Sequence, residues 1–186
     1  MKKFLCLILA CTSLLLAGSA LPANADTSNS NVALASRDSV QYLPPIDLVS
    51  SNKGKVDGKK MHYQVLIIDV WASWCGPCRN QIPILHELKK KYGNKLEIIG
   101  ISVDSSEADH KKAIKQLNIS YPSCLSANKT NAAFLEAMQK ATGQTIRGIP
   151  HLVIVDGMGH IVYARSGMHP KGALEDIIKP IIDKKG

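Results

Sequence analysis

The chain reads Asp69-Val-Trp-Ala-Ser-Trp-Cys-Gly-Pro-Cys78 where a continuous apolar run passes into an amphipathic segment. The apolar run, Val65 to Val70, is rich in β-branched residues, a pattern typical of a central strand covered on both faces. The segment from Gly76 to Tyr92 repeats apolar residues at helical spacing and ends at a Gly-Asn pair. The two cysteines are therefore expected to open a helix directly after a buried strand.

Two kinds of chemistry suit a Cys-x-x-Cys pair. A structural zinc site needs a second close group of Cys or His ligands, and the sequence offers none, so we expect no metal. Redox chemistry needs the pair at a helix N-terminus, where unpaired N–H groups and the helix dipole stabilise a thiolate at Cys75. Gly76 lets a partner backbone approach, and Pro77 fits the first helical turn, where a missing N–H costs nothing. The redox interpretation is favoured.

The rest of the chain alternates strand-like and helix-like segments. Strands are expected at 46–50 (an edge strand), 96–103, 121–125, 151–156 and 161–165, helices at 106–118, 131–141 and from 170 onward, and a turn at 52–60. This order predicts an α/β fold with a central mixed sheet, parallel with an antiparallel edge, and helices on both faces. The long segment 126–145 is expected to bring its helix to the rim of the site.

Residues 1–25 predict a signal peptide. A positive start at Lys2 and Lys3 precedes a short apolar run, and Ala23-Asn-Ala25 is a cleavage site. A retained anchor is the alternative, but Gly, Ser and Pro residues break the run before a spanning length. Lipid modification at Cys11 is a further, minor alternative. Residues 26–39 predict a flexible leader, and 40–186 the folded domain, in the periplasm or another extracytoplasmic space.

Charge and cysteine content limit the function classes. Without residues 1–25, 21 basic residues face 15 acidic ones, so the net charge falls from +8 to +6. The lysine clusters lie on or beside predicted helices, where they solvate the outer face, so we expect no nucleic-acid partner. Five cysteines are present, and Cys6 and Cys11 leave with the signal peptide. The remaining cysteines are the redox pair Cys75 and Cys78, and Cys124, which we expect to be a buried inert thiol.

The stretch 69–78 resembles the active-site sequence of thioredoxins. Because the chain is expected to be exported, it is most similar to the membrane-associated or secreted thioredoxins of the TlpA/ResA type. The resemblance covers roughly Val65 to Ile182, and its specific parts are the cysteine motif and Gly148-Ile149-Pro150. It implies a thioredoxin-like fold and a thiol–disulfide oxidoreductase whose only redox group is the Cys75–Cys78 disulfide, with no further cofactor.

The resemblance also implies roles for single residues. Cys75 would attack a substrate disulfide, Cys78 would resolve the mixed disulfide, and Asp69 would move protons to and from Cys78. A carboxylate inside an apolar strand should have a raised pKa, as such proton transfer requires. Exported reductases of this type often carry Glu three residues after the second Cys, where this chain has Gln81. The acid role therefore falls to Asp69 alone.

The substrate-binding residues follow from the same resemblance. Pro150 matches a cis-proline that faces the disulfide, and the backbone of Ile149 would pair with a substrate strand. Trp74, Gly76 and Pro77 complete the set beside the nucleophile. His151 directly follows the proline and is either a surface residue at a strand end or a residue that contacts substrate and tunes the thiolate.

The expected function is reduction of disulfides in exported proteins by a monomer, supplied with electrons by a membrane donor. The Gly-Pro dipeptide carries no cation that would further stabilise the Cys75 thiolate, which favours a reducing potential. The alternatives are a disulfide-forming oxidant and a copper-binding chaperone of the same fold. Copper carriers of this fold usually space their cysteines by three residues and add a distant His, for which His151 is the sole candidate here.

Overall fold

The computed structural model describes residues 40–184, and the account below concerns that part of the chain. The predicted signal peptide (1–25) and leader (26–39) lie outside the described residues, so both stay predictions. Between residues 40 and 184, no helix combines the length and the apolar character that crossing a membrane requires.

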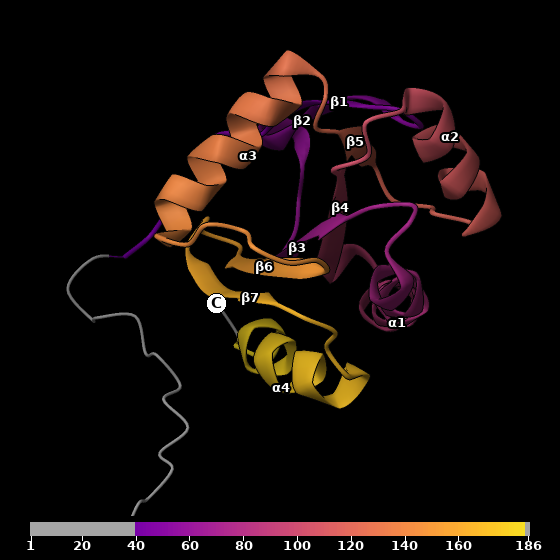
Figure 1. The fold of residues 1–186 in the computed structure, drawn as a ribbon. Coiled ribbons are helices and arrows are strands. Elements are labelled where there is room, and N and C mark those ends of the chain that lie inside the picture. Colours follow the sequence, from indigo (N-terminus) through magenta and orange to yellow (C-terminus); the bar gives the residue numbers. More distant parts are fainter. Residues whose placement is uncertain (1–39, 185–186) are drawn as a thin grey trace, which may run out of the picture. The chain divides into compact units, whose positions relative to one another are not determined.

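A mixed β-sheet forms the centre of the described domain (Figure 1). Its strands are β1 (Asp47–Ser50), β2 (Gly54–Asp57), β3 (Val65–Trp71), β4 (Leu96–Ser102), β5 (Ser123–Leu125), β6 (His151–Asp156) and β7 (Ile161–Ser166). Their order across the sheet is β2-β1-β5-β4-β3-β6-β7. The central strands β5, β4 and β3 are parallel, and the flanking strands pair antiparallel. The predicted mixed sheet is confirmed.

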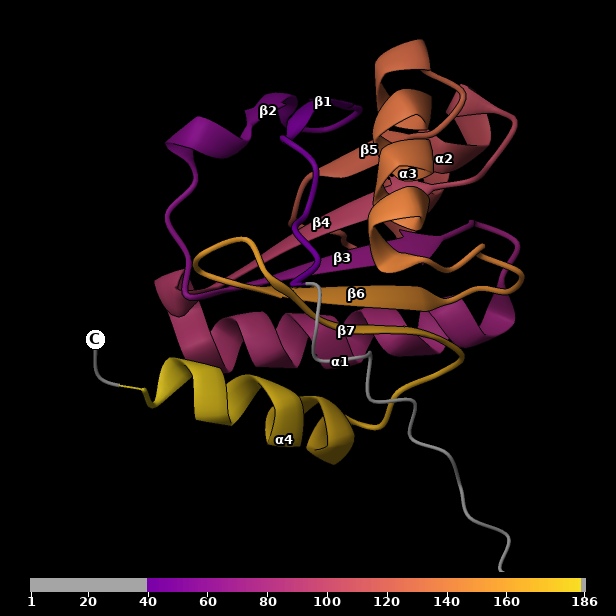
Figure 2. The ribbon, with the colours of Figure 1, turned by 90° about the vertical axis from the view of Figure 1, so that its left-hand side faces the viewer.

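Helices cover both faces of this sheet, as predicted. They are α1 (Gly76–Tyr92), α2 (Glu107–Gln116), α3 (Lys129–Thr142) and α4 (Lys171–Ile182). Figure 2 shows the sheet nearly edge-on, with α1 and α4 on one face and α3 on the other. Helix α2 adds Ala113 and Ile114 to the core on the α1 face.

Strand β3 is the centre of the core because all seven of its residues are buried. Successive side chains point to opposite faces of a strand. Val65, Ile67 and Trp71 pack with α1 and α4, while Leu66, Ile68 and Val70 pack on the α3 face. The same alternation turns Asp69 toward α1, the helix that follows the strand.

The end of β3 is held by the buried indole of Trp71. Its Nε1 donates to the Ser123 Oγ at 3.3 Å, and that hydroxyl lies 2.8 Å from His110 Nε2 on α2. The ring fits because residue 100 on β4 is glycine: a Cβ there would lie 3.0 Å from the indole nitrogen. Polar contacts thus tie β3, β5 and α2 together across Gly100 of β4, just before the redox motif.

Two predictions for the start of the domain are wrong. The segment at 46–50 was expected to be an edge strand, but β1 lies between β2 and β5. The segment 52–60, expected to be a turn, contains β2 and a short 3-10 helix, Gly58–Lys60. β2 has a single buried apolar side chain, Val56, among exposed or half-exposed neighbours. One apolar residue gives no alternation to recognise, so only the pairing with β1 reveals the strand.

Candidate active site

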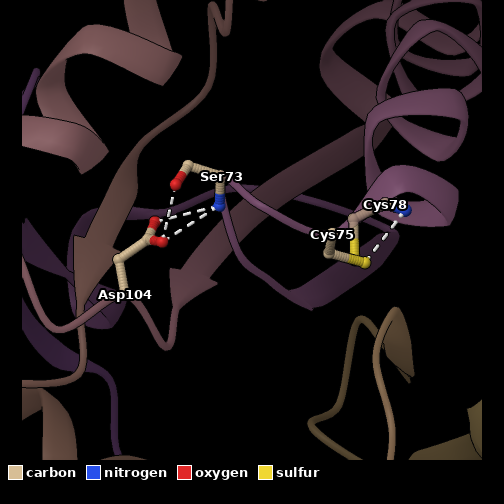
Figure 3. The surroundings of a disulfide bond; sticks show 4 residues. All are labelled: Ser73, Cys75, Cys78 and Asp104. Atoms are coloured by element: carbon tan, nitrogen blue, oxygen red, sulfur yellow. Dashed lines mark hydrogen bonds between the residues drawn. A yellow bond between two sulfur atoms is a disulfide. The ribbon is translucent and has the colours of Figure 1, made fainter.

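The two cysteines of the motif meet at the beginning of α1, as the sequence predicts. Cys75 is the N-cap residue, and its Sγ accepts a hydrogen bond from the Cys78 backbone N–H at 3.2 Å. The two residues form a disulfide (Figure 3). Cys75 is 5% exposed and Cys78 is fully buried. Of the two cysteines, Cys75 is therefore the one with exposed surface, and its position at the helix N-terminus is one that stabilises a thiolate.

A carboxylate that sequence reasoning missed holds the loop before the disulfide. Asp104 follows β4, and its two oxygens accept from the Ser73 N–H, each at 3.1 Å, while one accepts from the Ser73 hydroxyl at 2.8 Å (Figure 3). A further bond from the Ser102 hydroxyl, at 2.7 Å, orients the carboxylate. The parallel register of β3 and β4 pairs Trp71 with Ser102, so both chains leave the sheet side by side. An acidic residue directly after the predicted strand 96–103 is the signal that could have identified Asp104.

Asp69 is fully buried in β3, and neither of its oxygens has a hydrogen-bond partner among the described residues. Burial disfavours the charged carboxylate and raises the pKa of Asp69 to about 7. The raised pKa expected from the sequence is therefore present. The Asp69 charge also acts on Tyr121: burial raises the pKa of that phenol, and the charge of Asp69 raises it further. A carboxyl group with this pKa can take up and release a proton near neutral pH.

The segment before β6 places a proline next to the redox loop. The peptide bond between Ile149 and Pro150 is cis, as the resemblance implies. Ile149 lines the same pocket as Trp74, which precedes the disulfide. The Pro150 carbonyl accepts a hydrogen bond from the Gly167 N–H at 2.8 Å, so the loop after β7 supports this turn. The substrate contacts expected of Ile149 and Pro150 stay predictions.

His151 is not the surface residue that one interpretation expected. The side chain is only 2% exposed, and its Nδ1 lies 2.8 Å from the Ser166 Oγ on the neighbouring strand. Burial lowers the pKa of His151, and the nearby His169 lowers it further. Because β6 is covered by helices on both faces and paired on both edges, a side chain at its first position is enclosed. Both effects favour the neutral imidazole.

The rim of the site is open and apolar. Trp74 is 69% exposed, and Gly76 and Pro77 are also exposed at the start of α1. A pocket of about 280 Å³ lies beside the tryptophan, and it is lined mainly by apolar side chains: Val70, Val103, Leu135, Ile146 and Ile149. Leu135 comes from α3, which confirms the prediction that the helix of segment 126–145 reaches the rim of the site.

The remaining candidates lie away from this centre. Cys124 is buried in β5, and burial raises the pKa of its thiol to about 12, which fits an inert thiol. No three His, Cys, Asp or Glu side chains between residues 40 and 184 come together as metal ligands.

Replacing Asp69 with Asn tests the buried carboxyl group. The pKa of about 7 lies above the ordinary value of 3.8, so the folded protein binds this proton more tightly than the unfolded chain does. The contribution of Asp69 to the free energy of unfolding should be fully present below about pH 4. It should fall by up to about 1.4 kcal/mol per pH unit as the pH rises toward 7. Urea unfolding of oxidised Asp69→Asn should show a flatter pH dependence than wild type.

Asp176→Asn is the matched control, because it removes an exposed carboxylate from α4 and should leave the slope unchanged. Parallel wild-type and Asp69→Asn curves would contradict the assignment.

The same variant tests proton transfer, since an amide cannot accept the Cys78 proton. Its reduction of a protein disulfide should slow by about a hundredfold at neutral pH.

Comparisons with known proteins show the family to which the chain belongs. Residues 17–178 match the family model described as Redoxin. The thiol-disulfide oxidoreductase ResA of Bacillus cereus is 26% identical over 129 residues, which cover 68% of this chain and 69% of that protein. Thioredoxin of Bacillus subtilis is 27% identical over 114 residues, which cover 61% of this chain and 79% of that protein.

Solved structures show the same fold. A thiol:disulfide interchange protein of the thioredoxin family from Chlorobium tepidum superposes with a TM-score of 0.69 at 21% identity, covering 77% of this chain and 97% of that one. At this identity the likeness supports the fold alone. Together with the family match over most of its length and the Cys75–Cys78 disulfide at a helix N-terminus, it shows that the chain belongs to the redoxin family and is a thiol–disulfide oxidoreductase of thioredoxin-like fold.

Proposed function

We propose that this oxidoreductase works in the cell envelope and reduces disulfides of exported proteins. The observation that carries the proposal is the position of Cys75, which caps α1 and has no cationic side chain bonded to its sulfur among the described residues. The helix N-terminus makes the sulfur a usable nucleophile. The absence of further stabilisation keeps the dithiol form a good electron donor.

The first step joins the reduced protein to its client. The Cys75 thiolate attacks one sulfur of the client disulfide, and a new S–S bond forms between Cys75 and the client. The second client sulfur leaves with the electron pair of the broken bond and takes up a proton. Trp74, which directly precedes Cys75 and is exposed, and Ile149 line one pocket, and they would hold the client strand during the attack.

The second step releases the client. Cys78 loses its proton, and its sulfur attacks Cys75, which re-forms the intramolecular disulfide and expels the client thiolate. Two electrons have then passed from the dithiol to the client. Asp69 would accept the Cys78 proton, because it lies on the α1 face of β3 and its pKa of about 7 matches the working pH.

The environment of His151 supports the reducing direction. A protonated imidazole beside Cys75 would stabilise the thiolate and make the protein a stronger oxidant. Burial instead lowers the pKa of His151, and a second histidine, His169, opposes its protonation. Arg79, the cation nearest in sequence to the cysteines, is exposed to solvent on α1.

The roles of the two cysteines can be separated by trapping. Cys78→Ser should accumulate mixed disulfides with protein clients, because the attack by Cys75 still occurs and the resolving thiol is missing. Cys75→Ser should accumulate none, since Cys78 is fully buried. Non-reducing gel electrophoresis after quenching with acid measures the adducts. Trapping by Cys75→Ser instead of Cys78→Ser would reverse the assignment.

The direction of electron flow can be measured as a potential. Equilibration of the Cys75/Cys78 pair with glutathione buffers should give a value nearer the roughly −270 mV of thioredoxin than the roughly −120 mV of a strong oxidant. His151→Ala should change the potential by less than about 30 mV, because the native imidazole is already neutral. A wild-type potential near that of an oxidant, which drops sharply in His151→Ala, would identify a protein that makes disulfides.

Location in the envelope rests on the sequence of the first 25 residues and on the ResA relatives. Because the envelope is oxidising, each reduction needs an electron donor, and we propose a donor in the membrane as a partner. We also propose a monomer as the working form. N-terminal sequencing of the protein from its native cell should begin at Asp26. A chain that begins at Met1, or one that carries lipid on Cys11, would contradict cleavage at Ala25.

A further inference from the structure

A buried amide connects the cysteine helix to a distant loop. Gln81, one turn after Cys78, is fully buried, and its side chain bonds to both backbone groups of His169. The Gln81 Nε2 donates to the His169 carbonyl at 3.1 Å, and the Gln81 Oε1 accepts from the His169 N–H at 2.7 Å. His169 itself is 6% exposed and lies in the loop between β7 and α4.

The geometry requires an amide at position 81. A side chain that satisfies a neighbouring N–H and C=O at once needs one donor and one acceptor, and Gln and Asn offer these on two separate atoms at every pH. An ionised Glu could only accept and would face the His169 carbonyl oxygen. A leucine would leave both buried backbone groups without a partner. The identity of this residue is therefore set by the loop that it holds.

The same loop is bonded to the strand that carries the cis-proline. The Gly167 N–H donates to the Pro150 carbonyl at 2.8 Å. One residue earlier, Ser166 pairs with His151 in the sheet and its hydroxyl bonds to the imidazole. Hydrogen bonds to both ends of the short loop 166–169 thus connect α1 to the backbone at Pro150, with the covalent chain from His169 to Gly167 between them.

We propose that Gln81 is a positioning residue for client docking. It holds the loop 166–169, which in turn sets where the Ile149–Pro150 backbone lies relative to Cys75. A client strand paired at Ile149 then presents its disulfide to the Cys75 sulfur. This inference rests on the proposed function. A small disulfide needs no strand pairing and would not depend on Gln81.

Three variants separate this role from a general loss of packing. Gln81→Leu removes both hydrogen bonds at every pH. Gln81→Glu keeps both while its carboxyl group is protonated and loses the donor on ionisation. Asn80→Asp is the matched control, because it makes the same amide-to-acid change at the neighbouring position of α1, where the side chain is exposed.

The measurement is a ratio of two rates for the reduced, full-length protein. One is the rate of insulin disulfide reduction, and the other is the rate with a small aromatic disulfide. Both need the Cys75 thiolate, so its titration cancels in the ratio. The wild-type pH profile is the reference, because other groups that titrate or carry charge affect wild type as well. These are His169 and Arg165 of the loop side, His151 of β6 and Asp69 of β3.

The ratio of the insulin rate to the small-disulfide rate should be about tenfold lower in Gln81→Leu at all pH values. A tenfold change corresponds to a loss of client-docking free energy about equal to one neutral hydrogen bond. In Gln81→Glu it should match wild type near about pH 5 and fall about tenfold toward about pH 8, as the buried carboxyl group ionises. Asn80→Asp should follow wild type throughout. If Gln81→Leu does not fold, the pH profile of Gln81→Glu still tests the positioning role.

Amide hydrogen exchange at Gly167 gives a readout that does not need activity. Relative to Asn80→Asp, exchange of this N–H should accelerate in Gln81→Glu as the pH rises. Wild-type ratios and unchanged Gly167 protection in Gln81→Glu at every pH would overturn the positioning role. A wild-type protein that reduces neither disulfide would contradict the proposed function. Exchange of the Gly167 N–H would then test by itself whether Gln81 holds the loop 166–169.

Discussion

The N-terminus of α1 stabilises a thiolate at Cys75, and most of the surrounding structure serves to hold that helix end in place. The backbone N–H of Cys78 already points at the Cys75 sulfur. On one side, Asp104 fixes the loop before the helix through Ser73. On the other, Gln81 ties the second turn of the helix to the loop after β7. Two separate sets of hydrogen bonds therefore determine the position of one sulfur atom.

Two buried titratable groups of the described domain lack hydrogen-bond partners. Asp69 has no hydrogen-bond partner for either carboxylate oxygen, and His169 has none for Nδ1, within the described residues. Burial drives each toward its neutral form, raising the pKa of Asp69 and lowering those of His151 and His169. Among the described residues, the only hydrogen bond to the Cys75 sulfur comes from the Cys78 backbone N–H, which makes the helix terminus the main stabiliser of the thiolate. That arrangement favours electron donation, and it costs stability wherever Asp69 must ionise.

Strongly patterned segments could be predicted from the sequence, and weakly patterned ones could not. β3 and α1 were expected within a residue of their observed limits, because a continuous β-branched run and a capped helical repeat each admit one structure. β2 was missed, since one buried valine among exposed residues has no period. His151 could not be placed because a polar residue at a strand end is equally compatible with surface and interior until its neighbours are known.

The sequence by itself determined the chemistry: a Cys-Gly-Pro-Cys pair at a helix N-terminus, an acid within a buried strand, and a proline at the start of another. These follow from local pattern and from residue identity, which act over a few positions. Only the tertiary structure decided which polar groups hold the site. Asp104 meets Ser73 because β3 and β4 are parallel and in register, and Gln81 meets His169 across 88 positions of chain. Such contacts depend on strand order and helix placement, and no local pattern carries that information.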